Sequence, residues 1–202
     1  MVGQQQILSR FILAPSQQYD QSHQDRIRQH WKDSYRFKQA AVLIPLVHRE
    51  HGFNVVLTRR AKHLKHHPGQ IAFPGGRFEP ADDDLMATAI RETFEETNIT
   101  CYRNDILGSL ATLPTVSGYI VTPFIATINS DYTPVADHNE VDCIFEAPLH
   151  YLLNPKNIRQ HEFLINGNNH HVYNIPYEGY SIWGATAQMI KLLSDQIWHD
   201  DL

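Results

Sequence analysis

Three glutamates with the spacing of one helix face are the residues of this sequence best suited to chemistry. Glu92, Glu95 and Glu96 stand at positions i, i+3 and i+4, so in a helix their carboxylates converge on one face. Like charges so placed repel one another, and Arg91, four residues before Glu95, offsets only one of them. The remaining negative charge favours a bound cation. A site for a divalent metal ion is therefore the leading hypothesis, and a solvated acidic helix face is the alternative.

The residues around the glutamates indicate how the helix begins, ends and packs. Asp82, Asp83 and Asp84 can supply an N-cap, and Asn98 can supply a left-handed C-cap. The expected buried stripe consists of Met86, Ala89, Ile90, Thr93 and Phe94. Before the helix stands the turn Pro74-Gly75-Gly76, whose glycines allow backbone carbonyls to approach a ligand closely. This turn beside the carboxylates favours the metal site over the solvated face.

Composition and charge exclude several classes of protein. The chain has 202 residues, which suits one domain, with 42% hydrophobic and 19% charged residues as in ordinary globular proteins. A net charge of −5 argues against a nucleic-acid partner or a membrane-surface role. Cys101 and Cys143 are too few for a disulfide framework, and no apolar run or amino-terminal signal pattern indicates a membrane or secretion. We therefore expect a cytoplasmic protein.

The order of apolar segments predicts one α/β domain that follows a helical arm. The arm comprises residues 1–38, with helices over 7–12 and 24–37, and the domain comprises 39–202. We expect strands over 40–47, 54–59, 71–73, 106–113, 120–128 and 141–145, a short helix over 148–153, a hairpin of 158–165 with 171–175, and a closing helix over 185–198. Such an order favours a mixed sheet with helices on both faces. Whether the arm packs on the domain or on a second subunit is open.

A basic loop over residues 60–70 leads into the glycine turn. Its cationic side chains, with Arg59 just before it, could receive phosphate groups, and the alternative is a solvated loop. Elsewhere in the chain we expect ordinary structural roles. Trp183 is expected in the core rather than as a platform for base stacking, the two cysteines are expected to be buried, and His170-His171 lacks companions for a metal site.

The stretch from Gly76 to Asn98 resembles the Nudix box, usually written GX5EX7REUXEEXGU with U aliphatic. Upstream, Leu57-Thr58-Arg59-Arg60-Ala61 and the run from His67 to Gly76 (HPGQIAFPGG) are similar to a pattern of the Nudix subgroup that hydrolyses coenzyme A. Later segments, Ser117-Gly118-Tyr119 and Trp183-Gly184, also look like that subgroup. The resemblance covers roughly residues 40–195.

The match to the box has identifiable departures. The spacing from Gly76 to Arg91 is one residue longer than the general pattern. Asp82 stands where glutamate is usual, Thr93 replaces an aliphatic residue and Asn98 replaces glycine. In the upstream loop Lys65 stands where the coenzyme A subgroup usually has arginine. None of these departures affects the three glutamates.

The resemblance implies a Nudix fold, with a mixed sheet sandwiched between helices (α/β/α), and a metal site. Its ligands would be Glu92, Glu95 and Glu96, with the Gly75 carbonyl as a fourth. Ligands that offer only oxygen select Mg²⁺ or Mn²⁺. The residues implied to bind substrate phosphates are Arg59, Arg60, Lys65, His67 and Gln70.

The resemblance also implies catalytic roles. Arg91 would orient a glutamate such as Glu95 by ion pairing rather than touch the substrate. The general base is open between Glu92, which could bind metal or activate water, and Glu140 in the loop DHNEV.

Three functions remain open from the sequence. The leading hypothesis is a metal-dependent coenzyme A diphosphatase that gives 3′,5′-ADP and 4′-phosphopantetheine. The second is a pyrophosphatase for another nucleoside diphosphate derivative, such as ADP-ribose or a dinucleoside polyphosphate. The third is a non-catalytic Nudix-fold binding module, against which the complete set Arg91, Glu92, Glu95 and Glu96 argues. We expect a small-molecule substrate, with a homodimer as one option for the assembly.

Overall fold

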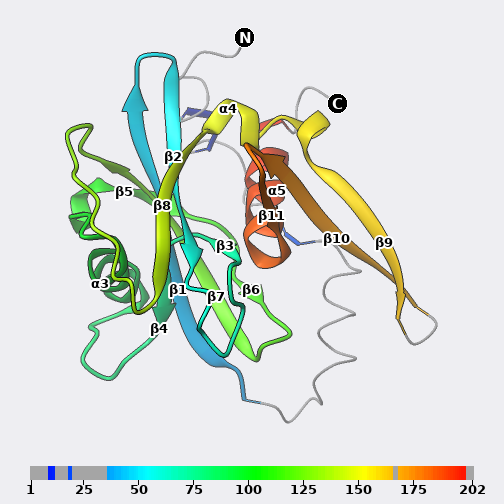
Figure 1. Cartoon of the computed structure of the whole chain (residues 1–202), viewed down its shortest axis with the longest axis horizontal. Coiled ribbons are helices and arrows are strands. Elements are labelled where there is room, and N and C mark those ends of the chain that lie inside the picture. Colours follow the sequence, from blue (N-terminus) through cyan, green and yellow to red (C-terminus); the bar gives the residue numbers. More distant parts are fainter. Residues whose placement is uncertain (1–8, 12–17, 20–35, 166–167, 199–202) are drawn as a thin grey trace.

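The computed structural model describes residues 9–11, 18–19, 36–165 and 168–198 (Figure 1). The expected helix over 24–37 lies almost wholly outside the described residues. Of the expected first helix, Ser9, Arg10 and Phe11 are described and are helical. Phe11 is 6% exposed in the main core, and its carbonyl accepts a hydrogen bond of 3.0 Å from Gln196. This part of the arm therefore packs on the body of its own chain.

The main sheet is mixed and is built around one long strand. Strand β1 (Lys38–Arg49) pairs antiparallel with β2 (Gly52–Arg60) and parallel with β7 (Tyr119–Ile128). The sheet order is β3-β2-β1-β7-β5. In addition, β4 pairs with β1, β6 pairs with β7, and β8 pairs with β2. The remaining bounds are β3 Ile71–Ala72, β4 Gly75–Arg77, β5 Ile106–Ser109, β6 Leu113–Pro114 and β8 Val141–Pro148.

Strand β1 is apolar over residues 40–47 because both of its faces are covered there. Ile44 and Leu46 face one hydrophobic core, whereas Leu43 and Val47 on the opposite face belong to the other. Helix α3 (Leu85–Thr97) covers one face, and α5 (Gly184–Trp198) covers the other (Figure 1). The expected α/β architecture, with a mixed sheet between helices, is confirmed.

A second sheet packs beside α5. Its order is β11 (Tyr180–Trp183), β10 (Asn168–Tyr177) and β9 (Arg159–Ile165), and all pairs are antiparallel. Helix α4 (Leu149–Leu152) and 3₁₀ turns over Arg103–Asp105 and Pro155–Asn157 complete the described elements. No helix among the described residues is long and apolar enough to cross a membrane.

Two local expectations were wrong. The strand expected over 106–113 ends at Ser109, after the register shifts between Ile106 and Gly108. The expected stripe on α3 was wrong at Phe94, which is 51% exposed. Ala89 and Thr93 of the expected stripe are buried, and two further small residues, Thr88 and Thr97, are buried with them. Small side chains let the helix lie close to the sheet, and the hydroxyls of Thr93 and Thr97 donate to carbonyls of the preceding turn.

Candidate active site

Helix α3 is set in place by a cap at each end. The Asp84 carboxylate accepts a 2.8 Å hydrogen bond from the Ala87 N–H, as an N-cap residue does. Asn98 adopts the left-handed conformation with φ of 57°, and its N–H donates to the Phe94 carbonyl. Both expected caps are confirmed. They fix the register in which Glu92, Glu95 and Glu96 face strand β4 and the loop after it.

The two glycines of β4 allow close contacts on opposite sides of the strand. A β-carbon at Gly75, whose φ is +153°, would overlap the Ala41 carbonyl and the Val42 Cα of β1. A β-carbon at Gly76 would overlap the Glu92 carboxylate. The Gly75 N–H also donates a 3.1 Å hydrogen bond to Glu96 Oε2. The glycine turn thus brings β4 against β1 and admits the carboxylates of α3.

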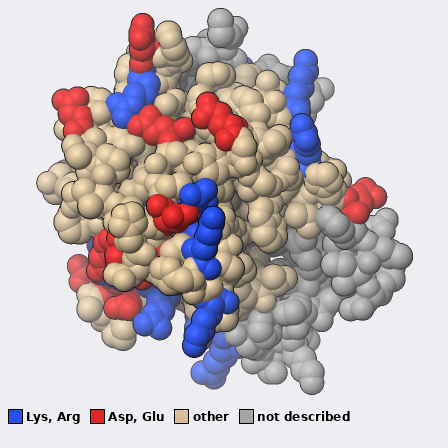
Figure 2. All heavy atoms as spheres, viewed as in Figure 1, with Lys and Arg blue, Asp and Glu red and all other residues tan. Residues whose placement is uncertain are grey.

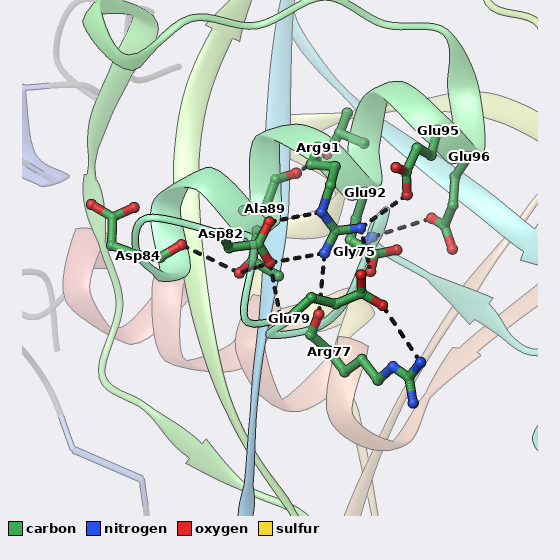
Figure 3. A network of polar contacts seen from close by, with 12 residues as sticks. Gly75, Arg77, Glu79, Asp82, Asp84, Ala89, Arg91, Glu92, Glu95 and Glu96 are labelled. Carbon is green, nitrogen blue, oxygen red and sulfur yellow. Dashed lines mark hydrogen bonds and ion pairs between the residues drawn. The ribbon is translucent and has the colours of Figure 1, made fainter.

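Arg91 is the centre of the polar network beside these glycines (Figure 3). Its Nε and Nη2 donate to the two oxygens of Asp82 at 2.8 and 2.9 Å. Its Nη1 donates to Glu92 at 3.0 Å and to Glu95 at 2.9 Å. The expected ion pair with Glu95 is confirmed. The bidentate pair with Asp82 was missed, although Asp82 stands at the glutamate position of the box.

Burial and charge shift the pKa values of these carboxyls in opposite directions. Hydrogen bonds from Arg91 hold the pKa of Asp82 far below its usual range, and Asp82 in turn raises the pKa of Arg91. Burial raises the pKa of Glu92. Burial raises the pKa of Glu96 to about 8, against the opposing effects of the Gly75 N–H and Arg60. Desolvated carboxylates of this kind gain stability from a nearby cation.

The donor set fits a hard divalent cation, but the side chains now contact protein groups. Glu92 and Glu95 are bonded to Arg91, while Glu96 faces the Gly75 N–H and Arg60, whose Nη1 is 4.0 Å from Glu96 Oε1. Within the described ranges, no three His, Cys, Asp or Glu side chains are gathered closely enough to hold an ion together. The ligand set Glu92, Glu95, Glu96 and Gly75 stays a prediction.

A cavity of about 540 Å³ adjoins the glycine turn. Arg60, His67 and Gln70, three of the five residues expected to bind substrate, line it together with Gly75 and Gly76. Figure 2 shows Lys and Arg side chains in a column over the lower central part of the viewed face, beside acidic side chains in the region of α3. In the lining itself, the cationic Arg60 stands with Gly75 and Gly76, which contact Glu96 and Glu92 respectively.

The other two expected substrate residues lie outside the lining of this cavity. Arg59 forms an ion pair of 2.6 Å with Asp142, and its guanidinium lies 5.8 Å from the Tyr180 ring centroid. Lys65 is an exposed residue of the loop. Neither is brought to the cavity in the described structure.

Sequence reasoning missed several residues that line the cavity. Trp183 was expected in the core, which was wrong: it is 47% exposed and lines the cavity. The alternation of strand β11 explains this, because its neighbour Ile182 is fully buried and takes the core position. Further lining residues that were not singled out as ligands are Arg77, Thr115, Ser117, Tyr119 and Gln188. The alternation in YSIW is the signal that could have placed Trp183.

Comparison with known proteins decides the family. The model of the NUDIX domain matches residues 37–165. This chain belongs to the Nudix family. It is 41% identical over 160 residues to the uncharacterized Nudix hydrolase NudL of Yersinia pestis (strain Pestoides F), covering 79% of this chain and 80% of that protein. NudL of Yersinia pseudotuberculosis serotype O:1b matches with the same identity and coverage.

A solved structure supports the fold alone. The MutT/nudix family protein from Enterococcus faecalis matches with a TM-score of 0.55 and 13% identity, covering 99% of this chain and 76% of that chain. As a Nudix hydrolase the protein is a pyrophosphatase, and Nudix hydrolases generally use divalent metal ions.

Three of the departures from the Nudix pattern, at Asp82, Thr93 and Asn98, have structural explanations. Asp82 reaches Arg91 in a bidentate pair even though it is one methylene shorter than glutamate. Thr93 is fully buried, where its hydroxyl donates to the Ala89 carbonyl. Asn98 provides the left-handed C-cap that glycine gives elsewhere in the family. The three substitutions therefore keep an anchor for Arg91, a buried side chain at position 93 and a cap at the end of α3.

Glu140 lies on the loop that approaches the same carboxylates. Its backbone carbonyl accepts a 2.8 Å hydrogen bond from the Ala61 N–H, which ties this loop to the end of β2. Its negative charge contributes to the raised pKa values of Glu92 and Glu96. Both candidates for the general base, Glu92 and Glu140, thus face one cluster, and their roles stay predictions.

Proposed function

We propose that this Nudix hydrolase cleaves the diphosphate bond of coenzyme A, in its free, acyl or oxidised form, with Mg²⁺ or Mn²⁺. The products are 3′,5′-ADP and 4′-phosphopantetheine. One observation carries the proposal. Arg60, His67 and Gln70, which belong to the segment that resembles the coenzyme A subgroup, line a single cavity with the glycines that contact Glu92 and Glu96.

The charge distribution of the cavity suits a diphosphate with larger groups on both sides. Arg60 and Arg77 offer guanidinium groups, which match phosphate oxygens in geometry and charge. Apolar and aromatic side chains form much of the remaining lining, including Leu113, Tyr119 and Trp183. Such walls suit the faces of the adenine ring and the methyl and methylene groups of the pantetheine arm.

Different residues would bind the metal ion, accept the proton of water and hold the carboxylates in position. Glu92, Glu95, Glu96 and the Gly75 carbonyl would hold the metal ion, which when bound neutralises charge on the diphosphate and lowers the pKa of water. Glu92 or Glu140 accepts the proton of the attacking water. Arg91, fixed by Asp82, holds Glu92 and Glu95 in position.

A substrate panel tests the proposal directly. Purified protein with Mg²⁺ or Mn²⁺ is assayed with coenzyme A, acetyl-coenzyme A, oxidised coenzyme A, ADP-ribose and dinucleoside polyphosphates. We expect coenzyme A or one of its two derivatives to have the highest kcat/KM. Faster turnover of ADP-ribose would overturn the assignment of substrate. No turnover of any compound, with metal bound, would favour a binding module.

Two variants connect the activity to the carboxylate cluster. Glu96→Gln keeps the size of a side chain that is 4% exposed but removes its charge, so we expect turnover to be abolished. Glu50→Gln, on an exposed turn after β1, is the matched control and should retain full activity. Metal binding, followed by the electron paramagnetic resonance signal of Mn²⁺, should weaken only in the Glu96 variant.

A further inference from the structure

Gln188 is a largely buried residue of the cavity lining whose side-chain amide has no hydrogen-bond partner among the described residues. It lies near the start of α5, and 5% of its surface is exposed. Its side chain forms no hydrogen bond with the described parts of the chain. An amide that is accessible from a cavity and has no protein partner can pair with a polar group that enters the cavity.

The polar atoms of the Gln188 amide are accessible to solvent although most of the residue is buried. In the described ranges, polar side-chain atoms that are both sealed from solvent and unpaired occur on Arg59, Arg60 and Thr122. Gln188 is not one of these residues, so its amide atoms are not sealed from solvent. The residue lines the cavity of about 540 Å³. Its oxygen can accept, and its NH₂ group can donate, hydrogen bonds with a group that enters there.

Trp183, five residues earlier, contributes an aromatic ring to the same wall. It is 47% exposed, although an indole usually gains most from burial. Gly184, between the two residues, has a φ of +67° and no side chain, and the Gln70 amide lies 3.1 Å from where its β-carbon would stand. This part of the cavity lining therefore offers the accessible indole of Trp183, a glycine turn, and the side-chain amides of Gln70 and Gln188.

We propose that Trp183 and Gln188 bind the adenine of the substrate. This inference rests on the proposed function, because coenzyme A carries one adenine. An exposed aromatic side chain is a stacking surface for a base. The donor and acceptor of a glutamine amide match the adjacent donor and acceptor on an edge of adenine.

The pantetheine arm is the other part of the substrate that could occupy this wall. It is a flexible chain without a planar ring, so it has no face to stack on Trp183, and ordering it costs more conformational entropy. A rigid base gains from both the indole and the paired amide. The observations therefore favour the base.

Binding of substrate fragments tests the inference without hydrolysis. Titration calorimetry in the presence of Mg²⁺ measures the affinity for 5′-AMP, for 5′-IMP, in which an oxygen replaces the amino group of adenine, and for 4′-phosphopantetheine. The variants are Gln188→Met and Trp183→Ala, with Lys191→Met as the control on the same helix but outside the cavity lining. Thermal unfolding checks that each variant is folded.

We expect 5′-AMP to bind more tightly than 5′-IMP. Gln188→Met should weaken 5′-AMP binding roughly five- to tenfold and remove the preference over 5′-IMP. Trp183→Ala should weaken both nucleotides roughly ten- to hundredfold, while Trp183→Phe restores part of the affinity. Lys191→Met should change neither, and 4′-phosphopantetheine should bind all variants equally.

Two results would overturn the inference. One is that Gln188→Met and Trp183→Ala weaken 4′-phosphopantetheine and leave 5′-AMP unchanged, which assigns the wall to the arm. The other is that the folded variants bind all three compounds like the unaltered protein. Failure of the proposed function gives a different pattern, because another adenine-containing diphosphate is then hydrolysed while the effects on 5′-AMP remain.

Discussion

The Glu92 carboxylate rests against the Cα of Gly76, in the space that a β-carbon at this position would occupy. The neighbouring Gly75 is constrained differently, because its Cα faces the backbone of Ala41 and Val42 in β1. Two adjacent glycines therefore serve separate purposes. One admits a carboxylate of the site, and the other lets two strands approach.

Alanine at each glycine should separate these purposes. Gly76→Ala should reduce kcat/KM roughly 100-fold, because Glu92 must move, and lower the free energy of unfolding by only about 1 kcal/mol. Gly75→Ala should lower the free energy of unfolding by about 3 kcal/mol, because the overlap is with backbone and φ is +153°. Enzyme kinetics and urea unfolding of both variants check this. Equal effects of the two variants on both measurements would contradict it.

Asp82 should be required for the position of Arg91. The buried Asp82 carboxylate accepts two hydrogen bonds from Arg91. Because Asp82→Asn removes its charge, we expect a loss of about 2–3 kcal/mol in the free energy of unfolding. Activity should fall as well, because Arg91 also holds Glu92 and Glu95. Asp82→Glu, the residue usual in the family at this position, should retain most activity. An active and fully stable Asp82→Asn variant would show that Arg91 needs no anchor.

Arg60 should affect substrate binding more than metal binding. Arg60→Gln should raise the KM for coenzyme A roughly 10- to 100-fold, because a guanidinium is lost from the cavity. Mn²⁺ should bind the substrate-free variant at least as tightly, because Arg60 no longer competes for Glu96 at 4.0 Å. Arg59→Gln is the matched control, since Arg59 pairs with Asp142. A larger rise in KM from Arg59→Gln than from Arg60→Gln would reverse these assignments.

Glu146 should make stability depend on pH in the acid range. Hydrogen bonds from Arg49, with others from Asn54 and Tyr132, lower the pKa of Glu146 from 4.5 to about 2. Because the pKa is lowered in the folded state, the stabilisation is complete above pH 4.5 and is lost as the pH falls towards 2. Allowing for partial exposure, we expect a loss of about 1–2 kcal/mol.

The measurement is urea unfolding of the protein and of Glu146→Gln between pH 6 and pH 2. The difference in unfolding free energy between the two proteins should shrink across this range. A difference that stays constant with pH would show that the charge of Glu146 does not stabilise the fold. Glu50→Gln, on an exposed turn, serves as the control.

The sequence by itself determined the local parts of the site. The spacing of Glu92, Glu95 and Glu96 and the caps at Asp84 and Asn98 depend on residues within one or two helical turns, and the structure has both caps and the helix between them. The buried strand β1 was also predictable, because a continuous apolar run indicates a strand covered on both faces. Local geometry follows from neighbours in the chain.

Only the tertiary structure decided which distant residues meet these local parts. Gln188 and Trp183 line the same cavity as the glycine turn although they lie more than a hundred residues away in the sequence, and the alternation in YSIW predicts only that Trp183 faces away from the core. The hydrophobicity of Phe94 predicted burial, yet the close approach of α3 to the sheet admits only small side chains, so Phe94 faces outward. Periodicity predicts which face of a single helix or strand is buried. The distance between packed elements decides which side chains fit between them and what cavity remains.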